Sequence, residues 1–296
     1  MCQAYALELY VLTFLRLAVG KPLILTIFLE KIMRVLYIII CCALASTALL
    51  WLGRFGKLPK RQAACAAFLS MVLASALLLL AVLPGNSFYG PVLTHGSTAK
   101  KQIALTFDDG PYPPYTQQLL KVLADKQVHA TFFMVGENAA KHPEIVKAVQ
   151  AGGHEIALHA GKHQDLLKLN QAELAANIAS GKSTLESLTG QRLLYMRPPH
   201  GFKDWQVLGA IEAAGLKAVN WSVIPRDWTN PGVQRIVDRV CYAAEPGAIV
   251  LLHDGDSPKN AAPREQTVAA VGLIIDQLRE EKYEFVTISE LEKQSL

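Results

Sequence analysis

Apolar and polar positions along residues 102–296 follow a pattern that predicts strands and helices in turn. Short apolar runs typical of buried strands lie at 103–108, 129–135, 155–159, 192–196, 217–222, 247–253 and 284–288. Amphipathic or alanine-rich stretches that predict helices separate them, at 115–126, 138–151, 171–189, 203–214, 231–244 and 264–282. This alternation predicts an α/β fold, a distorted (β/α) barrel of about seven parallel strands. A doubly wound open sheet is the structural alternative.

The first 84 residues have longer apolar runs. Residues 35–52 form an uncharged stretch of 18 residues, and residues 63–84 form one of 22. A helix needs roughly 20 such residues to cross a bilayer. The connecting sequence GRFGKLPKR holds four basic residues, and short loops rich in Lys and Arg stay in the cytoplasm. We therefore expect a transmembrane hairpin, with the rest of the chain on the extracytoplasmic side of the cell membrane.

Residues 5–29 are also apolar, but Arg16 and the Gly20-Lys21-Pro22 step divide them into two short runs. They could form a further span or an interfacial helix, and charge leaves both open. The sequence thus predicts a membrane segment over 1–84, a polar linker over 85–101 and a folded domain over 102–296.

Charge follows the same division. Residues 1–84 hold eight Lys and Arg against two acidic residues, a net charge of +6, which leaves 21 basic residues against 23 acidic ones in the remainder. The basic balance therefore belongs to the membrane segment, and we expect no nucleic-acid partner. Cys241 is the one cysteine beyond residue 84, which excludes an internal disulfide or a cysteine metal cluster in the folded domain.

Ionisable residues gather at the ends of the predicted strands. They are Asp108 and Asp109 after the first strand, His159 after the third, Arg197 after the fourth, Asp227 after the fifth and His253 after the sixth. The C-terminal ends of parallel strands share one face, where α/β enzymes build their active sites. We therefore expect these residues to converge.

The sequence HAGKH places His159 and His163 at a spacing that suits two imidazoles on one metal ion, although such a pair is weak evidence alone. Joined by a carboxylate from the Asp108-Asp109 pair, they make a two-histidine, one-carboxylate set. This set suits Zn²⁺ first, with Co²⁺, Ni²⁺ or Mn²⁺ as alternatives.

Hydrolysis at such a centre also needs a base and an acid. One carboxylate of the Asp108-Asp109 pair can accept the proton while the other binds the metal, with Arg197 placed to orient the base. A cation and an arginine would offset the repulsion between neighbouring carboxylates. His253, paired with Asp227, would be held protonated and serve as the acid.

Five motifs in one order make residues 100–292 resemble the polysaccharide deacetylases, the NodB-homology domains of carbohydrate esterase family 4. They are TFDDGP at 106–111, HAGKH at 159–163, RPPHG at 197–201, WSVIPRDW at 221–228 and LLH at 251–253. The resemblance implies a distorted barrel that removes N-acetyl groups from amino sugars with the help of a metal ion.

The resemblance also implies a role for each matched residue. It makes Asp108 the base, Asp109, His159 and His163 the metal ligands, Arg197 the residue oriented on the base, and Asp227 with His253 the acid pair. It places the substrate against Pro198, His200, Trp228 and Leu251, with the His200 backbone N–H as a candidate oxyanion donor. Three positions depart from the family pattern and bear on substrate preference: Ala160, His200 and Ile224.

We therefore expect a membrane-anchored, extracytoplasmic deacetylase of a GlcNAc-containing glycan, either peptidoglycan or a surface polysaccharide. Its partners would be the glycan and, through the N-terminal helices, the membrane; the sequence identifies no protein partner. Two alternatives stay open. One is a deacylase of a lipid-linked amino sugar, which a multi-span anchor favours. The other is a catalytically silent, membrane-tethered glycan-binding module, which the retained ligands, base and acid disfavour.

Overall fold

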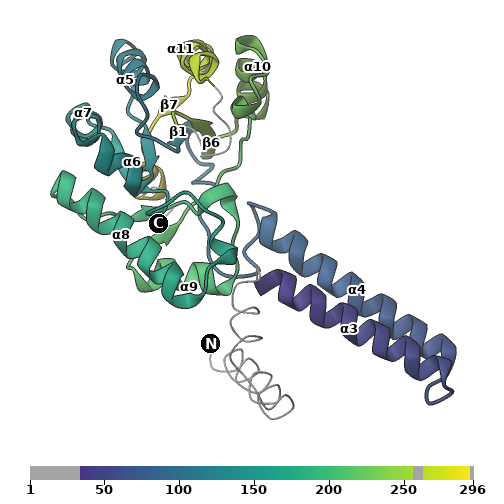
Figure 1. Ribbon diagram of the computed structural model, residues 1–296. Coiled ribbons are helices and arrows are strands. Elements are labelled where there is room, and N and C mark those ends of the chain that lie inside the picture. Colours follow the sequence, from purple (N-terminus) through teal and green to yellow (C-terminus); the bar gives the residue numbers. More distant parts are fainter. Residues whose placement is uncertain (1–33, 256–262, 294–296) are drawn as a thin grey trace. The chain divides into compact units, whose positions relative to one another are not determined.

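The computed structural model describes residues 34–255 and 263–293 (Figure 1). The described chain divides into two compact units. One contains the residues up to Leu78 together with Lys168–Asn170, and the other contains the rest of the chain from Leu79 on. The apolar segment at 5–29, expected as a further span or an interfacial helix, lies outside the described residues.

The described residues of the first unit include the helix α3 (Arg34–Arg54) and most of the helix α4 (Lys60–Val82), whose last residues belong to the second unit. Among the described helices, α4 alone has the length and composition to cross a membrane, and the apolar part of α3, Ile38–Arg54, is shorter. The expected span near 63–84 therefore corresponds to α4, and the span near 35–52 stays a prediction.

The packing of α3 with α4 buries small residues and leaves large ones exposed. Ala63, Ala67 and Ala74 are at most 5% exposed. The Ser46 hydroxyl of α3 donates to the carbonyl oxygen of Ala67 at 3.1 Å. Large apolar side chains of α4 are instead more than half exposed: Phe68, Leu69, Met71 and Leu73. Small residues at the contact between two helices are common in helix pairs of membrane proteins.

The second unit is built on one parallel sheet of seven strands. The strands are β1 (Gln102–Asp108), β2 (Thr131–Met134), β3 (Glu155–Leu158), β4 (Tyr195–Met196), β5 (Lys217–Ala218), β6 (Ala248–His253) and β7 (Glu284–Phe285). Their order is β5-β4-β3-β2-β1-β6, and β7 also pairs with β1. A parallel bridge from Val223 to Val250 joins the chain beyond β5 to β6. The sheet is thus curled on itself, which confirms the predicted distorted (β/α) barrel over an open sheet.

Helices cover the outer face of this sheet (Figure 1). They are α5 (Tyr115–Asp125), α6 (Gly136–Lys141), α7 (Pro143–Ala151), α8 (Gln171–Thr189), α9 (Trp205–Ala213), α10 (Val233–Ala243) and α11 (Glu265–Glu280). The helix predicted over 138–151 is broken into α6 and α7 at His142. Pro143 causes the break, because proline lacks an N–H and disfavours the helical conformation in the residue before it.

Short elements complete the unit. Three are 3-10 turns, η1 (Leu166–Lys168), η2 (Pro199–Gly201) and η3 (Asp227–Thr229). The helix α12 (Ile288–Lys293) follows β7. The expected linker at 85–101 forms isolated bridges with the barrel, from Leu93 to Val219 and from His95 to Ala248.

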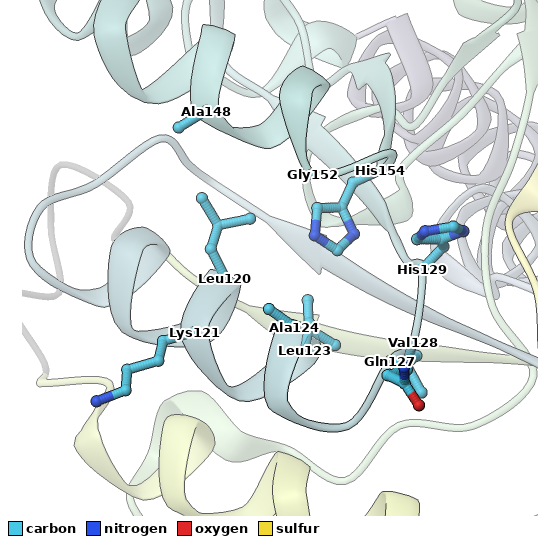
Figure 2. Close-up of a pocket in the computed structure, with 10 residues that line it drawn as sticks. All are labelled: Leu120, Lys121, Leu123, Ala124, Gln127, Val128, His129, Ala148, Gly152 and His154. Atoms are coloured by element: carbon cyan, nitrogen blue, oxygen red, sulfur yellow. The ribbon is translucent and has the colours of Figure 1, made fainter.

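A cavity of about 550 Å³ lies at the N-terminal ends of two strands, beside His129 and His154 (Figure 2). These histidines precede β2 and β3. The Nδ1 atom of His154 accepts from the backbone N–H of Ala130 at 3.2 Å. Burial, together with nearby His129, lowers the pKa of His154 to about 4, so this imidazole is neutral near pH 7. The hydrogen bond to Ala130 gives His154 a structural role. The cavity also lies at the N-terminal ends of the strands, whereas the predicted active site lies at the C-terminal ends.

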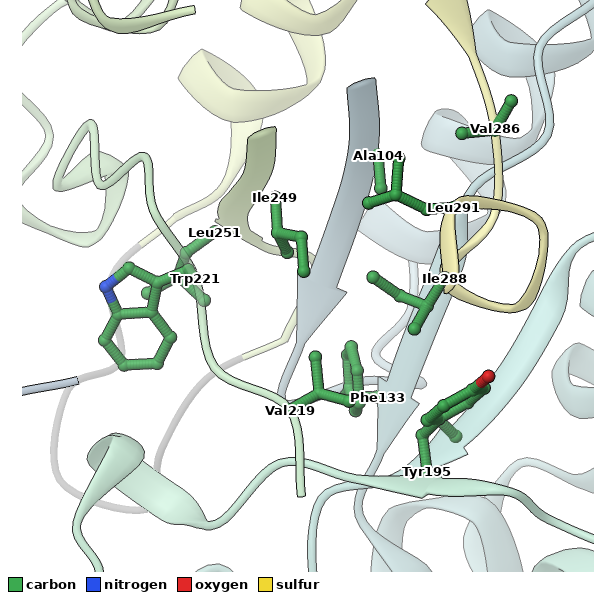
Figure 3. Close-up of a cluster of buried hydrophobic side chains, with 11 residues drawn as sticks. Ala104, Phe133, Tyr195, Val219, Trp221, Ile249, Leu251, Val286, Ile288 and Leu291 are labelled. Carbon is green, nitrogen blue, oxygen red and sulfur yellow. The ribbon is translucent and has the colours of Figure 1, made fainter. Parts of the chain in front are cut away.

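The barrel interior follows from the two-residue period of the strands. Residues of one parity on each strand point inward, and they form a buried cluster (Figure 3) of Ala104, Phe133, Ala157, Tyr195, Val219, Trp221, Ile249, Leu251, Val286, Ile288 and Leu291. The last two come from α12, which extends the cluster. The core therefore fills the barrel from strand residues and from a terminal helix that the sequence pattern does not predict.

We expect Leu291→Ala to lower the free energy of unfolding by about 2–5 kcal/mol, because Leu291 is 1% exposed and its truncation leaves a cavity in this cluster. Urea unfolding of the detergent-solubilised chain, followed by near-ultraviolet circular dichroism, measures the loss. Leu273→Ala is the matched control, since Leu273 on α11 is 47% exposed. Equal losses in the two variants would contradict the packing role of α12.

Candidate active site

The inward parity of the interior cluster continues into the polar residues at the strand ends. On β1 the inward residues Ala104 and Thr106 lead to Asp108, and on β6 Ile249 and Leu251 lead to His253. Asp108 and His253 are direct partners in the register of these two strands. The same hydrophobic pattern that fills the barrel therefore aims this carboxylate and this imidazole at one mouth.

Asp109 would point away from Asp108 if the strand simply continued. Its φ of 75° places it in the left-handed region instead, which Asp adopts more readily than most residues. Asn138 donates from Nδ2 to the Asp109 carbonyl oxygen at 2.8 Å. Gly255 passes so close that a Cβ there would lie 2.3 Å from the same oxygen. The turn brings both carboxylates of the pair to the mouth.

The carboxylate of Asp109 faces two imidazoles. Its Oδ1 lies 3.3 Å from Nε2 of His159 and 3.1 Å from Nε2 of His163. All three ligand atoms lie within 4.8 Å of one another. Burial raises the pKa of the Asp109 carboxyl, but hydrogen bonds from His159 and His163 and the charges of His253 and His159 hold it well below its usual value.

The histidine segment is fixed by groups behind it. The Nδ1 atom of His159 lies 2.9 Å from the carbonyl oxygen of Arg197. Donation of a proton to that oxygen fixes the tautomer that leaves Nε2 free for a metal ion. Ala160 has a φ of 76°, and Asn177 of α8 accepts from the backbone N–H of Gly161 at 2.8 Å. A side chain from α8 thus helps to hold the backbone between the two histidines.

These residues fit a divalent metal ion. The Oδ1 atom of Asp109 is buried and has no hydrogen-bond partner among the described residues other than the Nε2 atoms of these two histidines. The Nε2 atoms of His159 and His163 beside it can both be unprotonated while this carboxylate is ionised. One carboxylate oxygen and two imidazole nitrogens match the donor preference of Zn²⁺ and similar ions, and three protein ligands leave room for water and substrate.

Arg197 is fully buried beneath the mouth. One guanidinium nitrogen, Nη1, donates to Oδ1 of Asp108 at 2.6 Å and to the hydroxyl of Thr106 at 2.8 Å. The other, Nη2, donates to the backbone oxygen of Asn220 at 3.0 Å. The guanidinium lies over the ring of Phe133 at 4.0 Å. A planar fork held at three points gives Asp108 a fixed orientation and a compensating charge.

Asp227, which is fully buried, and His253, whose side chain is 13% exposed, form a second pair. Oδ1 of Asp227 lies 2.9 Å from Nδ1 of His253, and Oδ2 accepts from the His253 backbone N–H and from the hydroxyl of Thr267, each at 2.9 Å. Burial lowers the pKa of His253, but the charge of Asp227 and those of Asp109 and Asp108 raise it to about 9. The imidazole therefore carries a proton near pH 7 when no cation is bound.

The four predicted substrate-binding residues lie around these groups. Leu251 is 3% exposed and precedes His253 on the inward face of β6. The Trp228 and His253 rings are 5.2 Å apart. Pro198 is buried, whereas His200 is exposed, has a φ of 62° and lies 5.1 Å from the His163 ring, centre to centre. Of the family departures, Ala160 is buried and Ile224 is 41% exposed.

Five polar residues that support the site are missing from the sequence prediction: Thr106, Asn138, Asn177, Asn220 and Thr267. Each supports a predicted residue from behind rather than facing the mouth. Thr106 had a detectable signal, since it stands two residues before Asp108 and shares its parity. The other residues lie far along the chain from the groups they contact, so the sequence pattern gives no sign of these contacts.

The comparisons with known proteins agree with this geometry. The family model described as polysaccharide deacetylase matches residues 95–219. The chain is 43% identical over 194 residues to a peptidoglycan-N-acetylglucosamine deacetylase of Bacillus cereus. The aligned region covers 65% of this chain and 88% of that protein. The chain is 41% identical over 198 residues to a chitooligosaccharide deacetylase of Bradyrhizobium sp. (strain ANU 289), with 64% and 90% covered.

A solved structure gives the same result. A peptidoglycan N-acetylglucosamine deacetylase in complex with a naphthalenyl N-oxidanyl-benzamide matches with a TM-score of 0.64 and 34% identity. The match covers 69% of this chain and 94% of that one.

The fold and the site together define a metal-dependent hydrolase. The chain belongs to the polysaccharide deacetylase family, carbohydrate esterase family 4. It is a metal-dependent carbohydrate N-deacetylase, and Asp109, His159 and His163 form the divalent metal site typical of the family.

We expect the full chain to bind one divalent ion and His163→Ala to weaken binding by at least about 100-fold, since even loss of a residue that only supports a ligand costs 10–100-fold. Binding should weaken as pH falls, because protons compete for the ligand atoms. Titration calorimetry with Zn²⁺ measures both effects. His142→Ala is the control, since His142 lies between α6 and α7, outside the ligand set. Unchanged affinity in His163→Ala would contradict the ligand assignment.

Proposed function

We propose that the chain hydrolyses N-acetyl groups of GlcNAc residues in a glycan, either peptidoglycan or a surface polysaccharide. The observation that carries the proposal is the register pairing of Asp108 with His253 beside the metal ligands. Amide hydrolysis needs a base for water and an acid for the leaving amine, and these two side chains suit those roles. The names of the chitooligosaccharide and peptidoglycan deacetylases support the substrate class.

Zn²⁺ is the ion proposed for the site, held by Asp109, His159 and His163. When bound, it would supply Lewis-acid activation of water and of the acetamide carbonyl. Co²⁺, Ni²⁺ or Mn²⁺ could supply the same chemistry through the same ligands.

Asp108 is the proposed base. Arg197 occupies its Oδ1, which leaves Oδ2, 3.9 Å from Nε2 of His159, to accept a proton from the attacking water. The buried guanidinium prevents the carboxylate of Asp108 from rotating. Removal of such a base costs typically 10²–10⁴-fold in rate.

His253 is the proposed acid. Its Nδ1 is engaged with Asp227, so Nε2 is the atom that donates a proton to the departing amine nitrogen. The products are then acetic acid and an amino sugar with a free amine, which ionise to acetate and an ammonium group in water. The main-chain N–H of His200 is proposed to donate to the developing oxyanion.

The remaining contacts are assigned by position. Leu251 is proposed to line the pocket for the acetyl methyl group, and Trp228 and Pro198 to contact the sugar. His200 presents an exposed imidazole where relatives of the family often have an aromatic ring, so this residue would adjust which glycan is accepted.

The proposed location is the cell membrane, with the catalytic domain outside the cytoplasm. The exposed large apolar side chains and buried small ones of α4 support insertion in lipid. The basic loop between α3 and α4 supports a cytoplasmic turn. The proposed organisation is a membrane segment over 1–84, a connecting segment over 85–101 and the catalytic domain over 102–296.

We expect the full chain in detergent, loaded with Zn²⁺, to release acetate from N-acetyl chito-oligomers or peptidoglycan, and Asp108→Asn to reduce this rate by at least about 100-fold. Acetate is measured by an enzyme-coupled assay. Asp125→Asn, an exposed carboxylate at the end of α5, should keep the wild-type rate. If the metal binds but neither glycan is cleaved, a lipid-linked amino sugar becomes the substrate to test. If Asp108→Asn stays fully active, Asp108 is not the base.

The pH profile tests the acid. His253 acts in its protonated form, so kcat/KM should fall as pH rises through the His253 pKa. The metal ion would offset the charges of Asp108 and Asp109, which places this fall below the metal-free pKa of about 9. Asp227→Asn removes the anion that favours protonation, and the fall should move to lower pH. A shift to higher pH, or none, would argue against His253 as the acid.

A further inference from the structure

The buried ammonium of Lys203 caps the end of α4. Lys203 is 0% exposed, and burying an ammonium group is costly unless its protons are paired. Its Nζ donates to the backbone oxygens of Leu83 at 2.5 Å and Pro84 at 3.3 Å. Its backbone N–H donates to the carbonyl oxygen of Ala81 at 3.1 Å. A cation at a helix C-terminus satisfies the last carbonyl groups and the helix dipole.

This contact lies within the catalytic unit, because that unit begins at Leu79. The last residues of α4 are therefore packed with the domain that carries the active site. Burial lowers the pKa of Lys203 to about 8, so the amine still carries most of its charge near pH 7.

Asn220 links the same helix end to the catalytic machinery. It is 0% exposed, and its Nδ2 donates to the backbone oxygen of Pro84 at 3.1 Å and to that of Gly201 at 3.2 Å. Its own backbone oxygen accepts from Nη2 of Arg197 at 3.0 Å. One residue thus touches the end of α4, the RPPHG segment and the buried arginine.

Arg197 carries the connection to the mouth, through Nη1 to Oδ1 of Asp108 at 2.6 Å. The continuous series runs from the partly buried Pro84 through the buried Asn220 and Arg197 to the buried Asp108, and hydrogen bonds join each residue to the next. A shift of the Asn220 backbone would free one arm of the guanidinium and let it turn. Displacements near 1 Å can cost about 10²-fold in rate.

We propose that the C-terminal end of α4 is a positioning element of the active site, with Lys203 and Asn220 as the residues that transmit its position to Arg197 and the base. The inference rests on the proposed function, since it takes Asp108 as the base. It gives the last turn of an apolar helix a role in the rate of the reaction in addition to its proposed role in anchoring.

The test compares Lys203→Met and Asn220→Ala in the full chain in detergent, with Lys147→Met as control because Lys147 is an exposed residue of α7. We measure kcat and KM for acetate release from chito-oligomers, bound Zn²⁺ and the melting temperature, at an assay temperature far below melting. We expect kcat to fall about tenfold in both variants, with KM within about twofold and one ion retained. The control should match wild type.

A lower melting temperature with unchanged kcat would show a merely structural role and overturn the inference. Lys203→Met removes the buried charge and its two hydrogen bonds while keeping a side chain of similar length. If Asn220→Ala does not fold, Asn220→Ser keeps a hydroxyl donor and serves the same comparison.

A double-mutant cycle tests the route. Arg197→Lys keeps a charge beside Asp108 but has no second arm to reach the Asn220 oxygen. In this background Asn220→Ala should change kcat by less than about twofold, because the link it acts through is already broken. A further tenfold loss would overturn the route through Arg197. Full activity of Asp108→Asn would instead contradict the proposed function and leave the packing of α4 untouched.

Discussion

The site depends on the buried ion pair between Arg197 and Asp108. A carboxylate 2% exposed at the mouth of an apolar barrel is unfavourable without a compensating charge, and a second carboxylate follows it directly in the chain. The fully buried guanidinium gives Asp108 that charge, while Asp109 faces two imidazoles. The two carboxylates thus have different partners. Asp109 lies with the metal-binding histidines, and Asp108 is available for the proposed proton transfer. The backbone of Arg197 also accepts from a ligand histidine, which ties both halves of the site to one residue.

Sequence alone predicted the class of fold and the residues at the strand ends, because both follow from periodicity. Alternate residues of a strand point to the same side. The alternation that turns Ala104, Phe133 and Ile249 into the core also turns Asp108 and His253 toward the mouth. Periodicity could not predict the left-handed conformation of Asp109, which depends on the loop around Gly255, nor the support from Asn177, Asn220 and Thr267. These contacts join segments far apart in the chain, and each is one of many partners that a lone polar residue could have. The break between α6 and α7 at His142 could have been predicted from the sequence, because Pro143 follows it.

Hydropathy and packing give different information about the N-terminal helices. Hydropathy gives the length of an apolar stretch, which a buried helix of a soluble protein can also have. Packing adds which side chains are turned inward, and in α4 these are alanines while Phe68 and Leu69 face outward. The boundary between the units also falls inside α4, after Leu78, six residues earlier than the apolar stretch ends. An apolar run can therefore end in one structural unit and begin in another without a change in composition.

The bonds around Asp227 have a consequence for the proton balance of the reaction. Both of its oxygens are already engaged, by the imidazole, a backbone N–H and a threonine hydroxyl, so it has little capacity to store a proton for its partner. On the proposed assignment, each turnover leaves Asp108 protonated and His253 neutral, the reverse of the starting state. A proton must then leave Asp108, and another must reach His253, before the enzyme can act again. Resetting these two protonation states is thus a separate step of the cycle, which water entering the mouth after the glycan departs can carry out.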